Sequence, residues 1–232
     1  MRQKVPKGFV IFINGSTGVG KTTIAWALAK KYNISSIIGT DIIREILRYD
    51  VDHHQIDANR ILMESSYLAH TKLNHSEGDV VIEAFTRQCL YLLGAIISIM
   101  GRVRIKRDPV IIEGVNICAK QLFDEVPNDP YSRIFFINLY MSATEEHEKR
   151  INFRGSEVGE LPEKTERYLK NFDSIQKIDK YLKNDTLEAK RYYRYVPENI
   201  MSIDNSKSIR RTVKSISKAL NEKIQYILSS NN

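Results

Sequence analysis

The segment Gly15–Thr22 constrains what this 232-residue chain can fold into more than any other feature. It reads Gly-Ser-Thr-Gly-Val-Gly-Lys-Thr and fits the pattern Gly-x-x-x-x-Gly-Lys-[Ser/Thr] of a phosphate-binding loop. The apolar run Phe9–Ile13 before it predicts a buried strand, and Thr23–Ala29 after it predicts a helix. Because such a loop turns backbone N–H groups and the positive end of a helix dipole toward an anion, we favour a phosphate site over an ordinary glycine-rich turn.

Residue types within this loop predict separate roles. The Lys21 ammonium is expected to reach the β- and γ-phosphates of a nucleotide, and the Thr22 hydroxyl is expected to ligate Mg²⁺. We therefore expect ATP and Mg²⁺ as cofactors. The nucleotide is expected to contact the loop and the start of the helix: Gly15, Ser16, Thr17, Gly18, Val19, Gly20, Lys21, Thr22 and Thr23.

Five short segments rich in apolar, β-branched or aromatic residues are strand candidates: Gly8–Ile13, Ser36–Ile38, Pro109–Ile112, Arg133–Tyr140 and Ile200–Ile203. Helix-like stretches separate them. Continuous apolar strands that alternate with helices indicate an α/β fold, with a parallel, five-stranded sheet that helices cover on both faces.

The closing segment has apolar residues at spacings of three and four, which predicts a helix against the sheet: Ile209, Val213, Ile216, Leu220 and Ile224. Its basic residues are interpreted as a solvated face: Arg210, Arg211 and Lys214. We expect residues 1–232 to form a single domain.

Two helical segments are expected around this sheet. Residues 42–106, approximately, are interpreted as an insert that helps to build a substrate pocket, with helices over Asn59–His75 and Phe85–Arg104. Residues 145–165, approximately, are expected to form a lid.

A formal net charge of +7 and a pI near 9.3 are compatible with nucleic acid or with phosphorylated ligands. No aromatic and glycine-rich platform for single-stranded RNA occurs, so we favour the phosphorylated ligand. The longest apolar candidate, Leu90–Met100, is shorter than a membrane span, and the N-terminus lacks the apolar region of a signal peptide. We expect a cytoplasmic protein, with Cys89 and Cys118 as small core residues.

Ligands of an open α/β sheet bind beyond the carboxyl ends of its strands. After the second strand candidate, Asp41 is expected to accept the hydroxyl proton of an acceptor substrate or to hold a Mg²⁺-bound water. The alternative is a plain helix N-cap. Arg44, one turn later, is expected to clamp a carboxylate or phosphate of the same substrate.

After the third strand candidate, Glu113 takes the position of an acid that polarises Mg²⁺ or its water shell, and Gly114 leaves space beside it for substrate. Glu83 follows another apolar run, Val80–Ile82, but that run continues into a helical pattern. We therefore expect Glu83 near a helix N-terminus and outside the catalytic group.

After the fourth strand candidate, Ser142–Glu145 fits a capping box, and Arg150 and Arg154 lie four residues apart on one helix face. We expect both arginines to close over the γ-phosphate, the alternative being surface ion pairs with nearby glutamates, Glu146 and Glu157. After the last strand, Asp204 is expected to lie in a loop against adenine. The histidines are interpreted as lone surface residues: His53, His54, His70, His75 and His147.

Several segments together resemble archaeal 2-phosphoglycerate kinases: Gly15–Ala25, Ile38–Arg48, the helix around Phe85, Arg87 and Gln88, Val110–Val115, Glu145–Arg154 and Glu166–Phe172. The resemblance implies a P-loop kinase that phosphorylates the 3-hydroxyl of 2-phosphoglycerate, giving 2,3-bisphosphoglycerate. We expect an anionic acceptor that Arg44 and Arg87 bind. The chain has Asn116 where the family has a histidine.

Other functions stay open at this point. One is a kinase of a different small acceptor, such as a nucleoside, polyol or inositol. Another is a polynucleotide or RNA 5′-hydroxyl kinase, which the basic charge would suit. A nucleotide-dependent switch would need a water-positioning residue and an effector loop, and the sequence suggests neither.

Overall fold

The computed structural model describes residues 5–53, 57–73, 77–126, 133–157, 162–193 and 199–229. Its strands are β1 (Val10–Asn14), β2 (Ser36–Gly39), β3 (Val110–Gly114), β4 (Ile134–Tyr140) and β5 (Ile200–Asp204). They form one five-stranded sheet in the order β2-β3-β1-β4-β5, with every neighbouring pair parallel. The predicted α/β class and parallel sheet are confirmed, and each predicted strand is present with its ends shifted by at most two residues.

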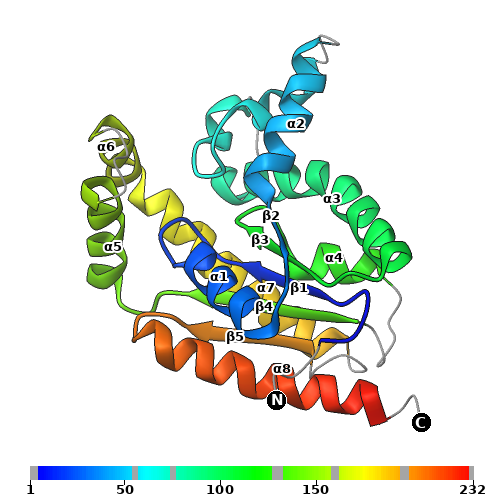
Figure 1. Cartoon of the computed structure of the whole chain (residues 1–232). Helices are drawn as coiled ribbons and strands as arrows, with labels where there is room; N and C mark the ends of the chain where they lie inside the picture. Colours follow the sequence, from blue (N-terminus) through cyan, green and yellow to red (C-terminus); the bar gives the residue numbers. More distant parts are fainter. Residues whose placement is uncertain are drawn as a thin grey trace.

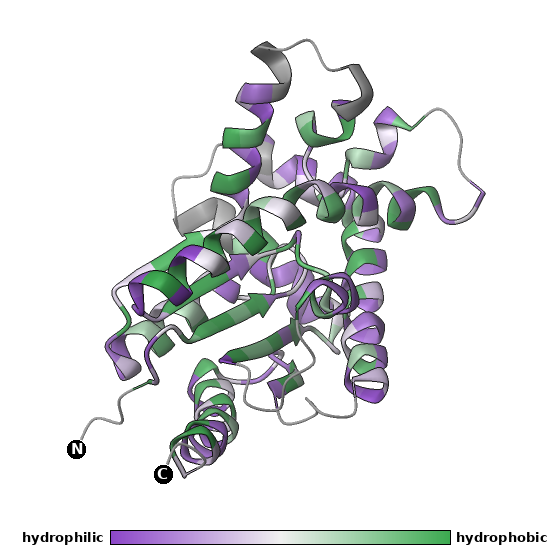
Figure 2. Ribbon diagram, turned by 90° about the vertical axis from the view of Figure 1, so that its right-hand side faces the viewer, coloured by the Kyte–Doolittle hydropathy of each residue, from purple (hydrophilic) through white to green (hydrophobic). Residues whose placement is uncertain are grey.

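Helices cover both faces of this sheet (Figure 1). Helices α1 (Lys21–Tyr32) and α8 (Ile209–Ser229) pack on one face, and α3 (Val80–Lys106), α4 (Ala119–Glu125) and α7 (Phe172–Tyr192) pack on the other. Alternate residues of β1 belong to the two cores, Ile11 to one and Phe12 to the other. Because both faces of its centre are buried, strands β1, β3 and β4 are mostly apolar, as the green sheet in Figure 2 shows.

Helix α8 has the apolar stripe that its sequence predicts. Ile216, Leu220 and Ile224 are fully buried against the sheet, and Val213 is partly buried beside them. Ile209, the first residue of the helix, is 44% exposed and lies outside this core. The stripe therefore begins one turn later than predicted.

The region between β2 and α3 differs from its prediction. After α2 (Thr40–His53), the described chain forms two short 3-10 helices, η1 (Asp57–Met63) and η2 (Ala69–Lys72), so a helix over Asn59–His75 is wrong. The buried Gln88 amide donates to the carbonyls of Ile61 and Glu64, at 2.7 and 3.0 Å. These tertiary hydrogen bonds use carbonyls that a continuous helix would need. His54 and His75 lie outside the described residues.

Helix α3 extends the predicted helix over Phe85–Arg104 at both ends. Asp79 caps it by accepting from the N–H groups of Val81 and Ile82, which places Glu83 in the first turn as expected. By length and composition α3 could also cross a membrane, with a mean hydropathy of 1.6 over 18 residues, whereas the sequence analysis considered only Leu90–Met100. Core helices can have the same length and composition, and α3 contributes eight buried residues.

A third apolar cluster lies between α3, α7 and the two helices that follow β4, α5 (Thr144–Glu157) and α6 (Pro162–Lys170). Tyr67 of the insert and Tyr168 of α6 meet edge to face in it, with ring centroids 5.5 Å apart. Cys89 and Cys118 are buried there as free thiols, as predicted. The cluster joins the insert to the segment after β4.

Candidate active site

The segment Gly15–Gly20 joins β1 to α1 and has the backbone that an anion-binding loop needs. Gly18 and Gly20 have φ angles of +85° and +90°, which favour glycine. A Cβ at Gly18 would lie 2.8 Å from the Ile151 side chain, and one at Gly20 would lie 2.9 Å from Asn205. Gly20 is the N-cap residue of α1 and makes no side-chain hydrogen bond to the first N–H groups of the helix.

Lys21 and Thr22 are the first residues of α1. The Lys21 ammonium donates to the Ser16 carbonyl at 2.7 Å, so its side chain folds back over the loop. The Thr22 hydroxyl donates to Glu113 Oε1 at 2.9 Å. Parallel pairing of β1 with β3 sets Ile13 opposite Glu113, which brings this acid to the loop. Thr22 and Glu113, which are far apart in the sequence and were both predicted to hold Mg²⁺, are thus in direct contact.

The Thr22 hydroxyl and the Glu113 carboxylate are hard oxygen ligands, which Mg²⁺ prefers. Within the described residues, no group of three or more His, Cys, Asp or Glu side chains is arranged to hold a metal ion. Magnesium in phosphate-transfer sites is usually held by one or two side chains, substrate phosphates and water. The pair therefore fits Mg²⁺ bound together with a nucleotide.

Gly114, predicted to leave room for substrate, lies against the start of α2. A Cβ at Gly114 would lie 1.7 Å from the Thr40 hydroxyl oxygen, so this glycine is required by close packing. Thr40 is fully buried, and its hydroxyl has no hydrogen-bond partner within the described part of the chain.

Asp41 and Arg44 lie on the first turns of α2, after β2. The Asp41 side chain is 71% exposed, and its carboxylate lies 3.4 Å from the Arg44 guanidinium. The Arg44 side chain is only 11% exposed, and its Nε has no hydrogen-bond partner among the described residues. A mostly buried guanidinium with an unsatisfied donor is suited to receive an anion.

Arg87 is less constrained. Its side chain is 55% exposed and forms an ion pair with Glu83 one turn earlier on α3. The structure places Arg87 on the exposed side of the insert with a partner already present.

Arg150 of α5 lies beside the phosphate loop, 3.9 Å from the position that a Cβ at Gly20 would take. Its Nε donates to Glu146 at 3.1 Å and its Nη2 to the Lys207 carbonyl at 3.3 Å. The ion pair with Glu146, which was the alternative to a role at the γ-phosphate, is therefore present, but Arg150 also lies next to the loop. The side chains of Arg154 and Glu157 lie outside the described residues.

The sequence did not predict the residues of α5 and α7 that form hydrogen bonds with the phosphate loop. His147 is buried, so its interpretation as a surface residue is wrong, and its Nε2–H donates to the Thr17 carbonyl at 2.6 Å. Asp179 of α7 accepts from the Ser16 hydroxyl at 2.7 Å and from the Met141 N–H at 3.1 Å. The only sequence signal is that His147 precedes the apolar Ile151 by one helical turn.

The loop after β5 also contacts the phosphate loop. Asn205, fully buried, donates to the Val19 carbonyl at 2.8 Å and accepts from the Thr212 hydroxyl at 2.7 Å. Asp204, predicted to contact the nucleotide, accepts from Ser142 and Ser206. Burial raises the Asp204 pKa, but these hydrogen bonds outweigh burial and lower the pKa below its usual value. In this structure Asp204 organises the junction of β5 with the start of α5.

Burial lowers the pKa of His147 below its ordinary value. Asp179 and the Thr17 carbonyl oppose this change, while Lys21 and Arg150 add to it. Since His147 binds its proton more weakly in the folded chain than in the unfolded one, its contribution to the free energy of unfolding should fall as the pH drops below about 6.5.

Burial raises the pKa of Asp179 and raises that of Asp185 to about 6, which changes stability in the opposite direction, so the test compares two proteins. Between pH 7 and pH 5, urea titrations should show a less favourable change in the free energy of unfolding for the wild type than for His147→Gln, which cannot titrate. Equal pH dependence in the two proteins would contradict this assignment.

Several archaeal proteins are similar to this chain over most of its length. The chain is 36% identical over 187 residues to a 2-phosphoglycerate kinase of Methanococcus maripaludis strain C5, covering 78% of this chain and 57% of that protein. It is 37% identical over 173 residues to the 2-phosphoglycerate kinase of Methanocaldococcus jannaschii, covering 75% and 53%. The chain is a homologue of the archaeal 2-phosphoglycerate kinases.

This 2-phosphoglycerate kinase homologue spans little more than half the length of these curated relatives. No family model matches it. Its fold is shared by a gluconokinase from Sinorhizobium meliloti 1021, with a TM-score of 0.53 at 12% identity, covering 99% of this chain and 100% of that one. The resemblance seen in the sequence and the fold of a P-loop kinase are thus confirmed.

Proposed function

We propose that the protein is an ATP-dependent kinase that transfers the γ-phosphoryl group to the 3-hydroxyl of 2-phosphoglycerate. The observation that carries phosphotransfer is the contact of Thr22 with Glu113 at 2.9 Å, beside the uncapped start of α1. The acceptor rests on the similarity to the archaeal relatives. The proposal includes a cytoplasmic location.

Separate groups would serve the two substrates. The backbone of Gly15–Gly20 and the Lys21 ammonium would bind the β- and γ-phosphates, and Arg150 would stabilise negative charge on the transferred group. Thr22 and Glu113 would hold Mg²⁺, which supplies neutralisation of phosphate charge when it is bound.

The acceptor would lie beyond the carboxyl ends of β2 and β3. The Asp41 carboxylate would take the proton of the attacking hydroxyl, and Arg44 would bind the acceptor phosphate or carboxylate. Arg87 would need to leave Glu83 to take part. In this proposal residues 42–106 are the acceptor-binding insert, and residues 145–165 include the lid.

We propose that the first turns of α5 do not move with the lid. His147 fixes the start of α5 to the Thr17 carbonyl, and Ile151 lies against Gly18. Movement on substrate binding would therefore involve residues after this anchored turn.

Arg44 provides the test of an anionic acceptor. We expect Arg44→Ala to raise the KM for 2-phosphoglycerate about 10-fold or more while the KM for ATP changes little, since a charged hydrogen bond typically contributes about 1.5–3 kcal/mol. Initial rates at varied concentrations of each substrate would measure this.

Arg48→Ala is the matched control, because Arg48 lies one turn later on α2 and pairs with Glu45. The control should leave both KM values near wild type. Efficient phosphorylation of an uncharged nucleoside or polyol, together with a harmless Arg44→Ala, would instead favour a different small acceptor.

A polynucleotide or RNA 5′-hydroxyl kinase is the second candidate, supported by the net charge of +7. It predicts RNA binding with a steep dependence on salt concentration and phosphate transfer to a 5′-hydroxyl end. Activity on 2-phosphoglycerate without activity on such an end would reject it.

A further inference from the structure

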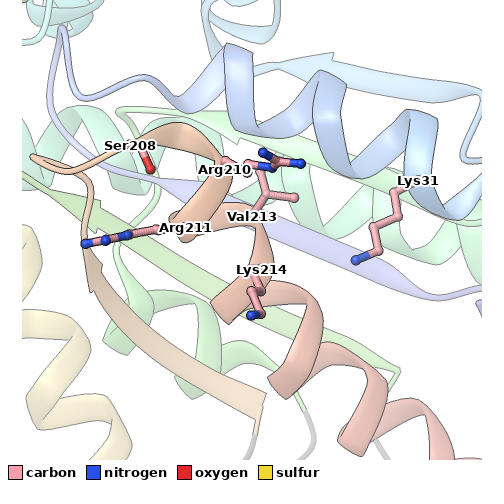
Figure 3. A pocket seen from close by; sticks show the side chains of 6 residues that line it. All are labelled: Lys31, Ser208, Arg210, Arg211, Val213 and Lys214. Carbon is pink, nitrogen blue, oxygen red and sulfur yellow. The ribbon is translucent and has the colours of Figure 1, made fainter.

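A surface pocket of about 520 Å³ lies between the end of α1 and the start of α8. Figure 3 shows the six residues that line it, one from α1 and the others from the start of α8 and the residue before it: Lys31, Ser208, Arg210, Arg211, Val213 and Lys214. Four of the six carry a positive charge, and none carries a negative charge. This concentration of charge goes beyond the solvated face that the sequence suggested.

These four cations have no acidic partner in the part of the chain that the structure describes. Across the described ranges, none of them forms an ion pair, and Lys31 only approaches the Tyr32 ring at 5.8 Å. The first turn of α8 has no acidic residue. Because a helix dipole disfavours cations at the N-terminus, Arg210 and Arg211 in the first turn of α8 are unfavourable there, and the like charges of the four side chains repel one another. A bound anion would remove both costs.

The pocket is separate from the phosphate loop. Lys21 begins α1 and Lys31 lies in its last turn, so the two are about 15 Å apart along the helix axis. A compound in the pocket and a nucleotide on the loop can therefore be bound at the same time.

We propose that this pocket binds a small compound with two or more phosphate groups, as a second anion site. Arginine matches phosphate with paired hydrogen bonds, and Arg210 and Arg211 supply two such groups. A single phosphate would leave most of the four charges unneutralised. A nucleic acid is a poorer match, because no aromatic side chain lines the pocket for base stacking.

Calorimetric titration with tripolyphosphate in Mg²⁺-free buffer tests the proposal. The wild type should bind two molecules, one on the phosphate loop and one in the pocket, whereas Arg210→Glu/Lys214→Glu should bind one, with the other site weakened 10-fold or more. The matched control is Lys30→Glu/Lys218→Glu, which makes a similar charge change on the same two helices outside the pocket and should keep both sites.

Thermal unfolding checks the fold of both variants, and acidic residues at the start of α8 should not lower its stability. Two sites in Arg210→Glu/Lys214→Glu, one site in the wild type, or an equal loss in the control would overturn the proposal. So would a pocket that binds single-stranded RNA and has no measurable affinity for tripolyphosphate. Ranking ATP, 2,3-bisphosphoglycerate and inorganic phosphate at the pocket identifies the source of the phosphates, with inorganic phosphate expected to be weakest.

Discussion

Replacing Lys21 with alanine is expected to remove phosphotransfer, with a fall in kcat of about 10²- to 10³-fold or more. The Lys21 ammonium already lies over the loop, 2.7 Å from the Ser16 carbonyl. It therefore needs only a small movement to reach phosphates held by the backbone of Gly15–Gly20. Its loss removes a positive charge at the place where negative charge develops during transfer. Initial rates at saturating ATP measure the effect.

The fold should survive this change, because Lys21 is only partly buried and belongs to neither core. Circular dichroism and thermal unfolding of Lys21→Ala would verify this. Lys30→Ala makes the same substitution in the last turn of α1 and should leave kcat near wild type. Near-normal turnover by Lys21→Ala would show that the loop is not the nucleotide site.

The strands and the loop could be predicted because their signals are local. The central strands β1, β3 and β4 are short apolar runs that are buried on both faces, and the phosphate loop is a fixed pattern of glycines, lysine and threonine. Because β3 lies next to β1 in the sheet, their parallel pairing brings Glu113 beside the loop. The contact of Thr22 with Glu113 is thus a consequence of sheet order, which the alternation of strands and helices restricts.

The rest depended on contacts between residues far apart in the sequence. Thr17 and His147 are separated by 130 positions, and Ser16 and Asp179 by 163. Nothing near His147 or Asp179 in the sequence reveals these partners. The same reason explains the wrong helix at Asn59–His75, because the Gln88 amide, on α3, donates to two carbonyls of this segment. Local propensity was overridden there by a buried tertiary hydrogen bond.

Substitutions of Asp41 and Glu113 should have different kinetic effects, although both residues are acids at the ends of neighbouring strands. We expect Asp41→Asn to lower kcat about 10²-fold or more, the usual effect of losing a general base, with the KM for ATP nearly unchanged. Asparagine keeps the size of the side chain but cannot take the hydroxyl proton. Steady-state rates with both substrates varied would measure the change.

Glu113→Gln is the comparison that gives the Asp41 result its meaning. The Glu113 carboxylate accepts from the Thr22 hydroxyl at 2.9 Å, so its loss in Glu113→Gln should raise the Mg²⁺ concentration needed for half-maximal rate. Asp41 is 71% exposed and contacts Arg44 instead, so Asp41→Asn should leave the Mg²⁺ requirement unchanged. If both substitutions had small and equal effects on rate and Mg²⁺ requirement, Asp41 and Glu113 would be structural residues and the acceptor base would lie elsewhere. A large kcat effect confined to Asp41→Asn would instead place proton transfer at the start of α2, beside the guanidinium that is proposed to hold the acceptor.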